Sequence, residues 1–183
     1  MVEKMANNCF YEMKVVGDKK KNIEEFISLL NYTHPDGKCF ARIFSADANP
    51  IEEKDGKYSV LISGDCAWSV ATCMTNNFMS YSSEDKSGKL TNLAEATKKL
   101  MLMVEIFSEE IGIGFAEHII YSNGICIVDE VEDYNEVWYD SDEYGTVEEY
   151  IEAEDLTLTP EQIQDLKDGE YVSIGGFDKT FTI

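Results

Sequence analysis

Histidine and cysteine are the residue types in this chain that most readily carry catalysis or bind a metal, and neither type is arranged to do so. The five cysteines show no CxxC spacing, and neither His34 nor His118 lies in a known ligand pattern. His118 falls in an expected strand and could act as a general base, but no serine or cysteine lies in an elbow motif that would pair with it. Gly112-Ile113-Gly114 lacks the third glycine and the helix of a dinucleotide loop. The sequence therefore predicts no catalytic residue, no metal site and no cofactor.

The acidic loop from Asp140 to Gly145 is the best candidate for a calcium site. An EF-hand loop has acids at positions 1 and 3 and glycine at position 6, and Asp140, Asp142 and Gly145 fit. Tyr144 and Ile151, however, stand where a side-chain ligand and a bidentate glutamate are needed. We therefore expect no calcium there. Three of the cysteines, Cys66, Cys73 and Cys126, are expected to be small buried side chains.

Charge is the most informative property of the sequence, because it is concentrated in one segment. The chain has 183 residues, of which 36 are acids and 15 are bases, and its formal net charge is -21. Residues 100–166 hold 19 acids and no lysine or arginine, and 13 of these acids lie between residues 129 and 155. Acids that only kept the protein dispersed would be scattered and would not exclude bases. The segment therefore predicts a surface with a specific use.

A base-free acidic surface resembles nucleic acid and is complementary to a protein that binds it. Direct DNA binding is not expected, because the basic residues cluster only in Lys19-Lys20-Lys21 and Lys98-Lys99. We predict instead that the acids bind a basic partner protein. The partner-binding residues that we expect are Glu130, Glu132, Asp133, Glu136, Asp140, Asp142, Glu143, Glu148 and Glu149.

A disordered acidic tail is the alternative interpretation of this segment. Against it, many apolar and aromatic residues interleave the acids: Val131, Tyr134, Val137, Trp138, Tyr139, Tyr144, Val147, Tyr150 and Ile151. The spacing of the charges also matters. Residues 129–155 would carry one charge per about 7 Å as an extended strand and one per about 3 Å as a helix, against about 3.4 Å in single-stranded DNA. Mimicry therefore requires a segment that is compact, folded back or paired with Glu105, Glu109, Glu110 and Glu117.

Hydrophobic periodicity predicts the elements that must position these acids. Alternation predicts a strand over 10–16, further strands are expected over 39–46, 58–63 and 102–107, and Ser122-Asn123-Gly124 predicts a hairpin between 115–121 and 125–131. An apolar stripe at Ile23, Phe26, Ile27 and Leu30 predicts a helix with Asp18 as its N-cap, and a second stripe predicts a helix over 93–101.

Shorter elements are predicted around this framework. The spacing of Trp68, Ala71, Met74 and Phe78 indicates a short helix, with Trp68 as a structural anchor under the sheet. Thr159-Pro160 opens another helix, which Asp168-Gly169 closes. Final strands are expected over 171–174 and 180–183.

The order β-α-β-β-α-β followed by added strands predicts an α+β protein. We expect a ferredoxin-like split βαβ antiparallel sheet with an added hairpin and an acidic C-terminal extension, with both principal helices on one face. Residues 5–131 would form the ferredoxin-like domain. Residues 132–183 would form the extension, with a short helix and terminal strands packed on or beside the domain. No run of roughly 20 apolar residues and no apolar N-terminal run occurs, so we expect no membrane and a cytoplasmic location.

Three stretches resemble the YubB-type ferredoxin-like family of phages, plasmids and gut bacteria: residues 5–17, Asp65-Cys66-Ala67-Trp68, and Glu110 to Ala116. More narrowly, the whole chain is similar to type II-A anti-CRISPR proteins in its length, its residues 5–17 and its Trp68 segment. The resemblance implies a mobile-element protein in the cytoplasm of a bacterial host. It also implies an inhibitor that binds a type II CRISPR effector nuclease with its guide RNA.

Our leading hypothesis is therefore a non-enzymatic anti-CRISPR inhibitor whose acids occupy a channel meant for phosphate. A DNA mimic that antagonises restriction enzymes or other DNA-binding proteins is the first alternative. A ferredoxin-like ligand-binding module with solvated acids is the second, and a hydrolase or metal enzyme is the third. The sequence does not fix the stoichiometry, the oligomeric state or the step that is blocked.

Overall fold

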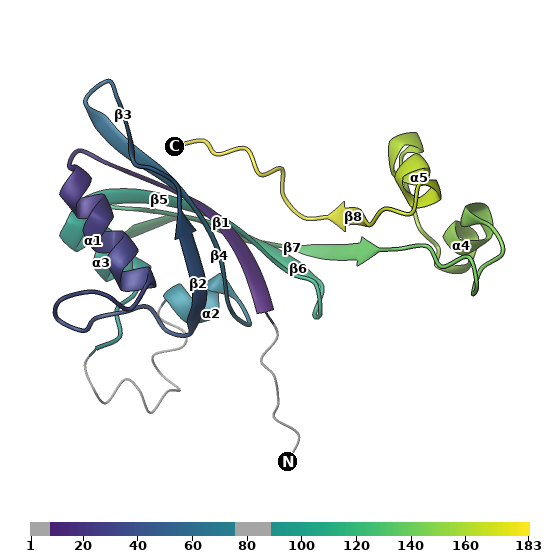
Figure 1. Ribbon diagram of the computed structural model, residues 1–183, viewed down its shortest axis with the longest axis horizontal. Helices are drawn as coiled ribbons and strands as arrows, with labels where there is room; N and C mark the ends of the chain where they lie inside the picture. The colour runs from purple at the N-terminus through teal and green to yellow at the C-terminus, as the bar shows by residue number, and fades with distance from the viewer. Residues whose placement is uncertain (1–7, 76–88) are drawn as a thin grey trace, which may run out of the picture.

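The computed structural model describes residues 8–75 and 89–183. Among these residues, eight strands form an antiparallel sheet (Figure 1). Seven of them follow the order β2-β4-β1-β5-β6-β7-β8, and β3 also pairs with β4. Residues 5–7 of the first resembling stretch and Phe78 of the predicted short helix lie outside the described residues. The chain is thus a mixed α and β protein, as the sequence predicts.

Three long strands form the middle of the sheet: β1 (Asn8–Gly17), β4 (Lys57–Ala67) and β5 (Leu102–Glu110). Side chains of β1 alternate between buried and exposed, as the alternation of its sequence predicts. β4 lies between β1 and β2 (Ile43–Ala48), and β1 lies between β4 and β5. Two strands joined through a helix are therefore separated by one antiparallel strand.

Helices α1 (Lys20–Leu30) and α3 (Leu93–Leu100) contact each other and cover the same face of the sheet (Figure 1). Their apolar stripes meet β1, β4 and β5 in one core, in which Ile23, Phe26 and Leu30 are almost fully buried. The short helix α2 (Val70–Met74) packs near the end of β4. The prediction that both principal helices lie on one face is confirmed.

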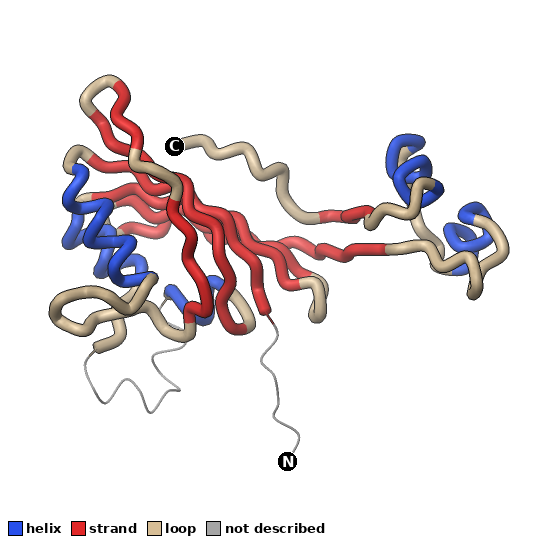
Figure 2. The backbone as a smooth tube through the Cα atoms, in the orientation of Figure 1, coloured by secondary structure: helices blue, strands red, loops and turns tan. Residues whose placement is uncertain are grey.

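The rest of the chain extends the sheet and then leaves it. β6 (Phe115–Ser122) and β7 (Ile125–Val137) form the predicted hairpin, and β7 continues beyond the sheet to pair with β8 (Val172–Gly175). Between β7 and β8 lie α4 (Val147–Ala153) and α5 (Pro160–Lys167). Figure 2 shows these two helices set apart from the sheet, at the end of the ribbon that β7 and β8 form.

Several predicted details are wrong. Lys19, and not Asp18, is the N-cap residue of α1, and its side chain makes no capping hydrogen bond. β2 begins at Ile43, because Arg42 adopts a positive φ of 50° that interrupts an extended chain. The strand β3 (Glu52–Lys54) was not predicted. Residues 180–183 form no strand.

Trp68 is not an anchor under the sheet. Its side chain is 37% exposed, its φ is 66°, and the guanidinium of Arg42 lies 4.5 Å from the centre of its ring. Cys66 and Cys73 are buried as expected, whereas Cys126 on the β7 edge is exposed. Trp68 therefore belongs to the surface, where a cation–π contact holds it.

Candidate partner-binding surface

Residues 138–171, here called the acidic lobe, contain twelve acids and a single base, Lys167. Local signals start both of the lobe's helices. Thr146 and Glu149 form a capping box at α4, and Thr159 and Gln162 form another at α5, where Pro160 occupies the first turn. The start of each helix in the lobe is therefore encoded by local capping residues, even though the net charge of the lobe opposes compaction.

The aromatic residues that interleave the acids form the small core of the lobe. Tyr150 and Leu166 are buried there together with Val137, Val147 and Val172. The Tyr144 and Tyr150 rings meet edge to face, with 4.9 Å between their centres. These apolar contacts hold the acidic segment in a defined shape, as expected from aromatics that a solvated tail would not need.

β7 carries the first four of the predicted acids. Glu132 and Asp133 are exposed, and Glu130 is exposed with one oxygen 3.8 Å from Nδ1 of His118. Glu136 is half-buried and accepts a hydrogen bond of 2.9 Å from the hydroxyl of Tyr134. Burial first, and this carboxylate in addition, raise the pKa of Tyr134 to about 12.

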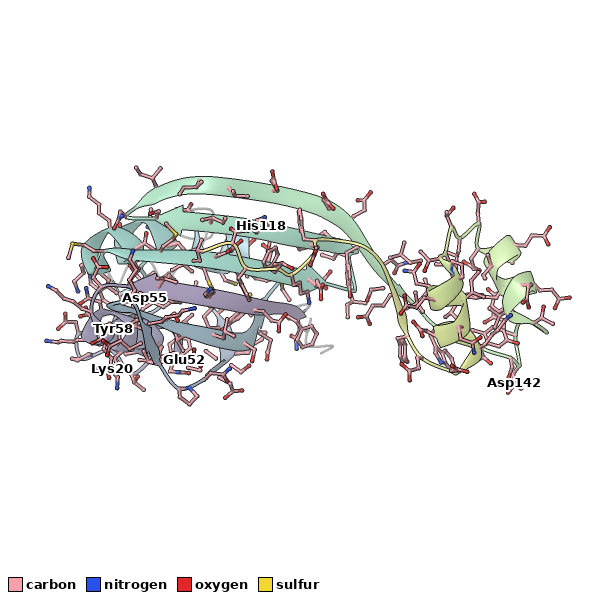
Figure 3. All side chains as sticks on the ribbon, turned by 90° about the horizontal axis from the view of Figure 1, so that it is seen from above. Lys20, Glu52, Asp55, Tyr58, His118 and Asp142 are labelled. Carbon is pink, nitrogen blue, oxygen red and sulfur yellow. The ribbon has the colours of Figure 1, made fainter. Side chains whose placement is uncertain are left out.

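The acidic lobe carries the other five predicted acids. Asp142 and Glu143 are exposed, and Figure 3 shows Asp142 at the far end of the lobe. Glu148 forms an ion pair of 2.6 Å with Lys167, and this hydrogen bond lowers the pKa of the carboxyl. Glu149 accepts a hydrogen bond from the amide of Thr146 within the capping box. Asp140 is half-buried and accepts one from the amide of Asp142.

The nine predicted acids thus divide into two groups. Glu132, Asp133, Asp142 and Glu143 have side chains with no hydrogen bond or ion pair to any residue that the structure describes. Each of the others is used at least in part within the chain. The four unpaired carboxylates are fully available to a cationic partner, and they lie on two elements, β7 and the loop before α4.

The acids are neither one extended strand nor one helix. From Asp129 to Glu136, five acids lie on eight residues of β7, which corresponds to about one charge per 5 Å at the usual rise of a strand. Alternation along β7 places successive side chains on opposite faces of the ribbon. The spacing of charges along β7 therefore lies between the values expected for an extended strand and for a helix. The acidic segment folds back on itself only in the lobe.

Three of the acids named as possible partners of the acidic segment are buried. Glu105, Glu110 and Glu117 are 0%, 1% and 3% exposed. These three therefore add nothing to an outer acidic surface, and pairing with them is not how the segment could become compact. The signal that could have found Glu105 is its place in the apolar run 102–107.

Glu117 caps a helix from inside the core. Its carboxylate accepts hydrogen bonds from the amides of Val70 and Ala71 at 2.8 and 3.2 Å, and from the hydroxyl of Ser108 at 2.6 Å. Burial nevertheless raises the pKa of Glu117, because desolvation outweighs these bonds. Its role is structural.

Glu105 lies beneath residues 176–183, here called the strap, which cross the open face of the sheet. Its carboxylate accepts hydrogen bonds from the amides of Thr182 and Ile183 at 2.6 and 3.1 Å, and is 3.0 Å from Nε2 of His118. Burial opposes ionisation, but these donors outweigh it and lower the pKa of Glu105.

Aromatic contacts complete the strap. Phe177 and Phe181 pack near the ring of Phe107, which itself stacks on His118 with 4.3 Å between ring centres. Lys179 adds an ion pair of 2.8 Å with Glu109. His118 is therefore held between Phe107 and the strap (its backbone position is labelled in Figure 3), and it serves to attach the strap.

No group of three or more histidine, cysteine, aspartate and glutamate side chains is placed to hold a metal among residues 8–75 and 89–183. In the loop tested for calcium, Asp140 instead caps a turn and the hydroxyl of Tyr139 donates to the carbonyl of Gly145. Within the same residues, no helix is both long and apolar enough to cross a membrane.

Comparison of the chain with family models, with curated proteins and with solved structures returned no match. The resemblance to the YubB-type family and to anti-CRISPR proteins thus remains a prediction that rests on the residues quoted for it.

Proposed function

We propose that this protein is a non-enzymatic anti-CRISPR inhibitor, which binds a type II CRISPR effector nuclease with its guide RNA and blocks DNA binding or cleavage. The observation that carries the proposal is the set of unpaired acids on β7 and the acidic lobe. They are held on a folded support, so little conformational entropy is lost when they bind.

The partner is chosen by electrostatic complementarity. RNA-guided nucleases hold their heteroduplex in a positively charged channel. The acidic lobe, with twelve acids against one base, presents charge of the opposite sign. The lobe projects from the sheet (Figure 1), a shape that suits insertion into a channel better than a flat face would.

For the sheet we propose the ferredoxin-like split βαβ arrangement. The strand order β2-β4-β1-β5, with every neighbouring pair antiparallel and both helices on one face, supports this assignment. β6, β7 and β8 then extend the sheet from β5. In this proposal the ferredoxin-like part is the rigid support and the added strands carry the acids outward.

A cleavage assay tests the function. The purified protein is titrated against a fixed concentration of a type II nuclease loaded with guide RNA, before target DNA is added. We expect cleavage to fall to background near equimolar protein, as a stoichiometric inhibitor requires. Undiminished cleavage at a large excess would contradict the proposal. A restriction endonuclease assayed in parallel identifies the alternative partner, because inhibition of that enzyme alone would also overturn the proposal.

A further inference from the structure

The outer edge of β7 is the feature from which we draw a further inference. β7 pairs with β6 along its first nine residues, Ile125–Asp133, but pairs with β8 only from Tyr134 to Val137. Over residues 125–132, no other strand or backbone hydrogen bond within the described parts of the chain occupies the opposite edge. In Figure 3, β7 forms the rim of the sheet farthest from β4.

This edge carries large apolar side chains that the fold does not bury. Ile125, Ile127 and Val131 are 68%, 58% and 62% exposed. β-branched residues favour strands, and an unpaired edge with such residues is a template for another strand. Exposed backbone groups and exposed apolar side chains thus coincide on one segment.

A second copy of this chain is a poor occupant of the edge. Asp129, Glu130, Glu132 and Asp133 place four acids within five residues. Antiparallel self-pairing centred on residue 129, 130 or 131 brings acids of the two copies directly opposite or diagonal to one another, and like charges in those positions are destabilising. The acids therefore oppose pairing of this edge with a second copy of the chain and favour a basic occupant.

We infer that the edge of Ile125–Glu132 binds an extended segment of a partner protein in which lysine or arginine alternates with β-branched apolar residues. The segment adds to the sheet as a further strand, with main-chain hydrogen bonds to β7. Its basic residues lie opposite Glu130 and Glu132 on one face of the sheet, and an apolar residue lies opposite Val131 on the other. The inference rests on the proposed function in one respect, that the partner is basic.

A synthetic peptide of alternating lysine and valine, seven residues long with blocked ends, tests the inference without the nuclease. Amide hydrogen exchange of residues 125–133 is measured by NMR with and without the peptide. At a peptide concentration ten times its dissociation constant, the amides that point away from β6 should exchange about tenfold more slowly. From Val128 to Glu132 alternate residues should be affected, because successive amides of a regular strand point in opposite directions, whereas a register shift leaves Ile127 without a partner on β6.

Two controls separate strand addition from simple charge attraction. The same peptide with every backbone amide N-methylated keeps its charge but loses all of its backbone donors, and should give no protection. A double variant, Glu130→Lys with Glu132→Lys, should weaken the unmodified peptide about tenfold, whereas Asp18→Lys with Glu24→Lys should not. Asp18 and Glu24 are exposed; Asp18 follows β1, and Glu24 lies on α1, which packs on β1, β2 and β4.

Three results would overturn the inference: no slowing of exchange in β7, equal protection by the N-methylated peptide, or a dimer in which these amides are already protected. The proposed function fails separately. If the peptide protects β7 but the nuclease is not inhibited, the edge site stands and the anti-CRISPR proposal falls. If the nuclease is inhibited but the peptide leaves β7 unprotected, only the edge site falls.

Discussion

In the sheet body, which consists of residues 8–75 and 89–137 with the strap, Glu105, Glu110 and Glu117 are at most 3% exposed. Each accepts hydrogen bonds from amides, with hydroxyls adding to two of the three. In the acidic lobe none of the twelve acids is buried. The same residue types therefore have different roles: in the body, carboxylates are buried hydrogen-bond acceptors, whereas in the lobe they lie at the surface. The net charge alone therefore overstates the acidic surface, because some of the acids are buried in the fold.

The largest expected effect lies in the core of the sheet body. Phe26 is fully buried and meets Phe40 edge to face, with 5.5 Å between ring centres. Phe26→Ala should lower the free energy of unfolding by about 3–5 kcal/mol. Urea unfolding followed by Trp68 fluorescence in a Trp138→Phe background measures this for the body. A loss below about 1 kcal/mol would show that the body does not depend on this core.

A smaller effect is expected from the core of the acidic lobe. Leu166 is fully buried, but its cluster has only five buried residues and can collapse around a cavity. Leu166→Ala should cost about 2–3 kcal/mol and should act on the lobe alone. Hydrogen exchange should show faster exchange in residues 138–171 and unchanged exchange in β1 and β4. Equal acceleration in both regions would mean that they unfold as one unit, and the comparison between them would fail.

The strap gives the next effect. Glu105→Gln removes the charge that receives the amides of Thr182 and Ile183, and should cost about 1–3 kcal/mol while freeing the strap. Glu109→Gln is the matched comparison on the same strand, because it removes the ion pair between Glu109 and Lys179 of the strap. The strap amides should exchange much faster in the first variant and only slightly faster in the second, because an ion pair near the surface contributes little. If both variants behave alike, the buried carboxylate is not what holds the strap.

The same contact predicts a dependence on pH. The pKa of Glu105 is lowered in the folded protein, so the carboxylate stabilises the strap above the ordinary glutamate pKa. That stabilisation is lost as the pH falls through the lowered value. Glu117, whose pKa is raised, acts in the opposite sense, because its contribution declines as the pH rises from the ordinary value through the raised one. The strap of Glu105→Gln should therefore show less response to acid than that of the wild type.

The smallest effect concerns the start of α4. The hydroxyl of Thr146 accepts a hydrogen bond of 3.2 Å from the amide of Glu149. Thr146→Ala should destabilise the lobe by about 1 kcal/mol, whereas Thr146→Ser should restore most of the loss. Circular dichroism during thermal unfolding measures both. Identical behaviour of the alanine and serine variants would show that the capping box does not stabilise the lobe.

Local signals made much of the fold predictable. The apolar stripe of α1, the capping residues of α5 and the Ser122-Asn123-Gly124 turn each specify structure within a few residues, and each was predicted correctly. The capping box at Thr146 is an equally local signal, but only one short helix was predicted in the extension and α4 was not. Helix ends are encoded locally, so α4 could also have been predicted from the sequence.

What the sequence could not supply depends on distant contacts. Glu105 is buried by Thr182 and Ile183, which lie 77 and 78 positions later in the chain. No residue near Glu105 in the sequence predicts these contacts. Trp68 was expected inside from its type alone, but a positive φ turns the chain there. For the candidate site, the partner-binding role of the nine acids stays a prediction. Which of them remain unpaired is decided by Tyr134, Thr146 and Lys167, and this required the structure.

The central claim is that the unpaired acids of β7 and the lobe contact a basic partner. Its most direct test compares two fourfold charge reversals by association kinetics with the guide-loaded nuclease. One variant changes Glu132, Asp133, Asp142 and Glu143 to lysine. The control changes Asp18, Glu24, Asp36 and Glu52, exposed residues outside the acidic segment, and shifts the net charge equally. Both variants are first shown to be folded.

We predict that the first variant associates at least tenfold more slowly than the wild type, while the control loses far less. The wild-type on-rate should also fall between about 0.1 M and about 1 M salt, as the screening length shrinks from about 10 Å to about 3 Å. Equal losses of association rate in the two variants would show that the acids act only through the total charge of the protein. Unchanged association in both would contradict the claim that the acidic surface binds the nuclease.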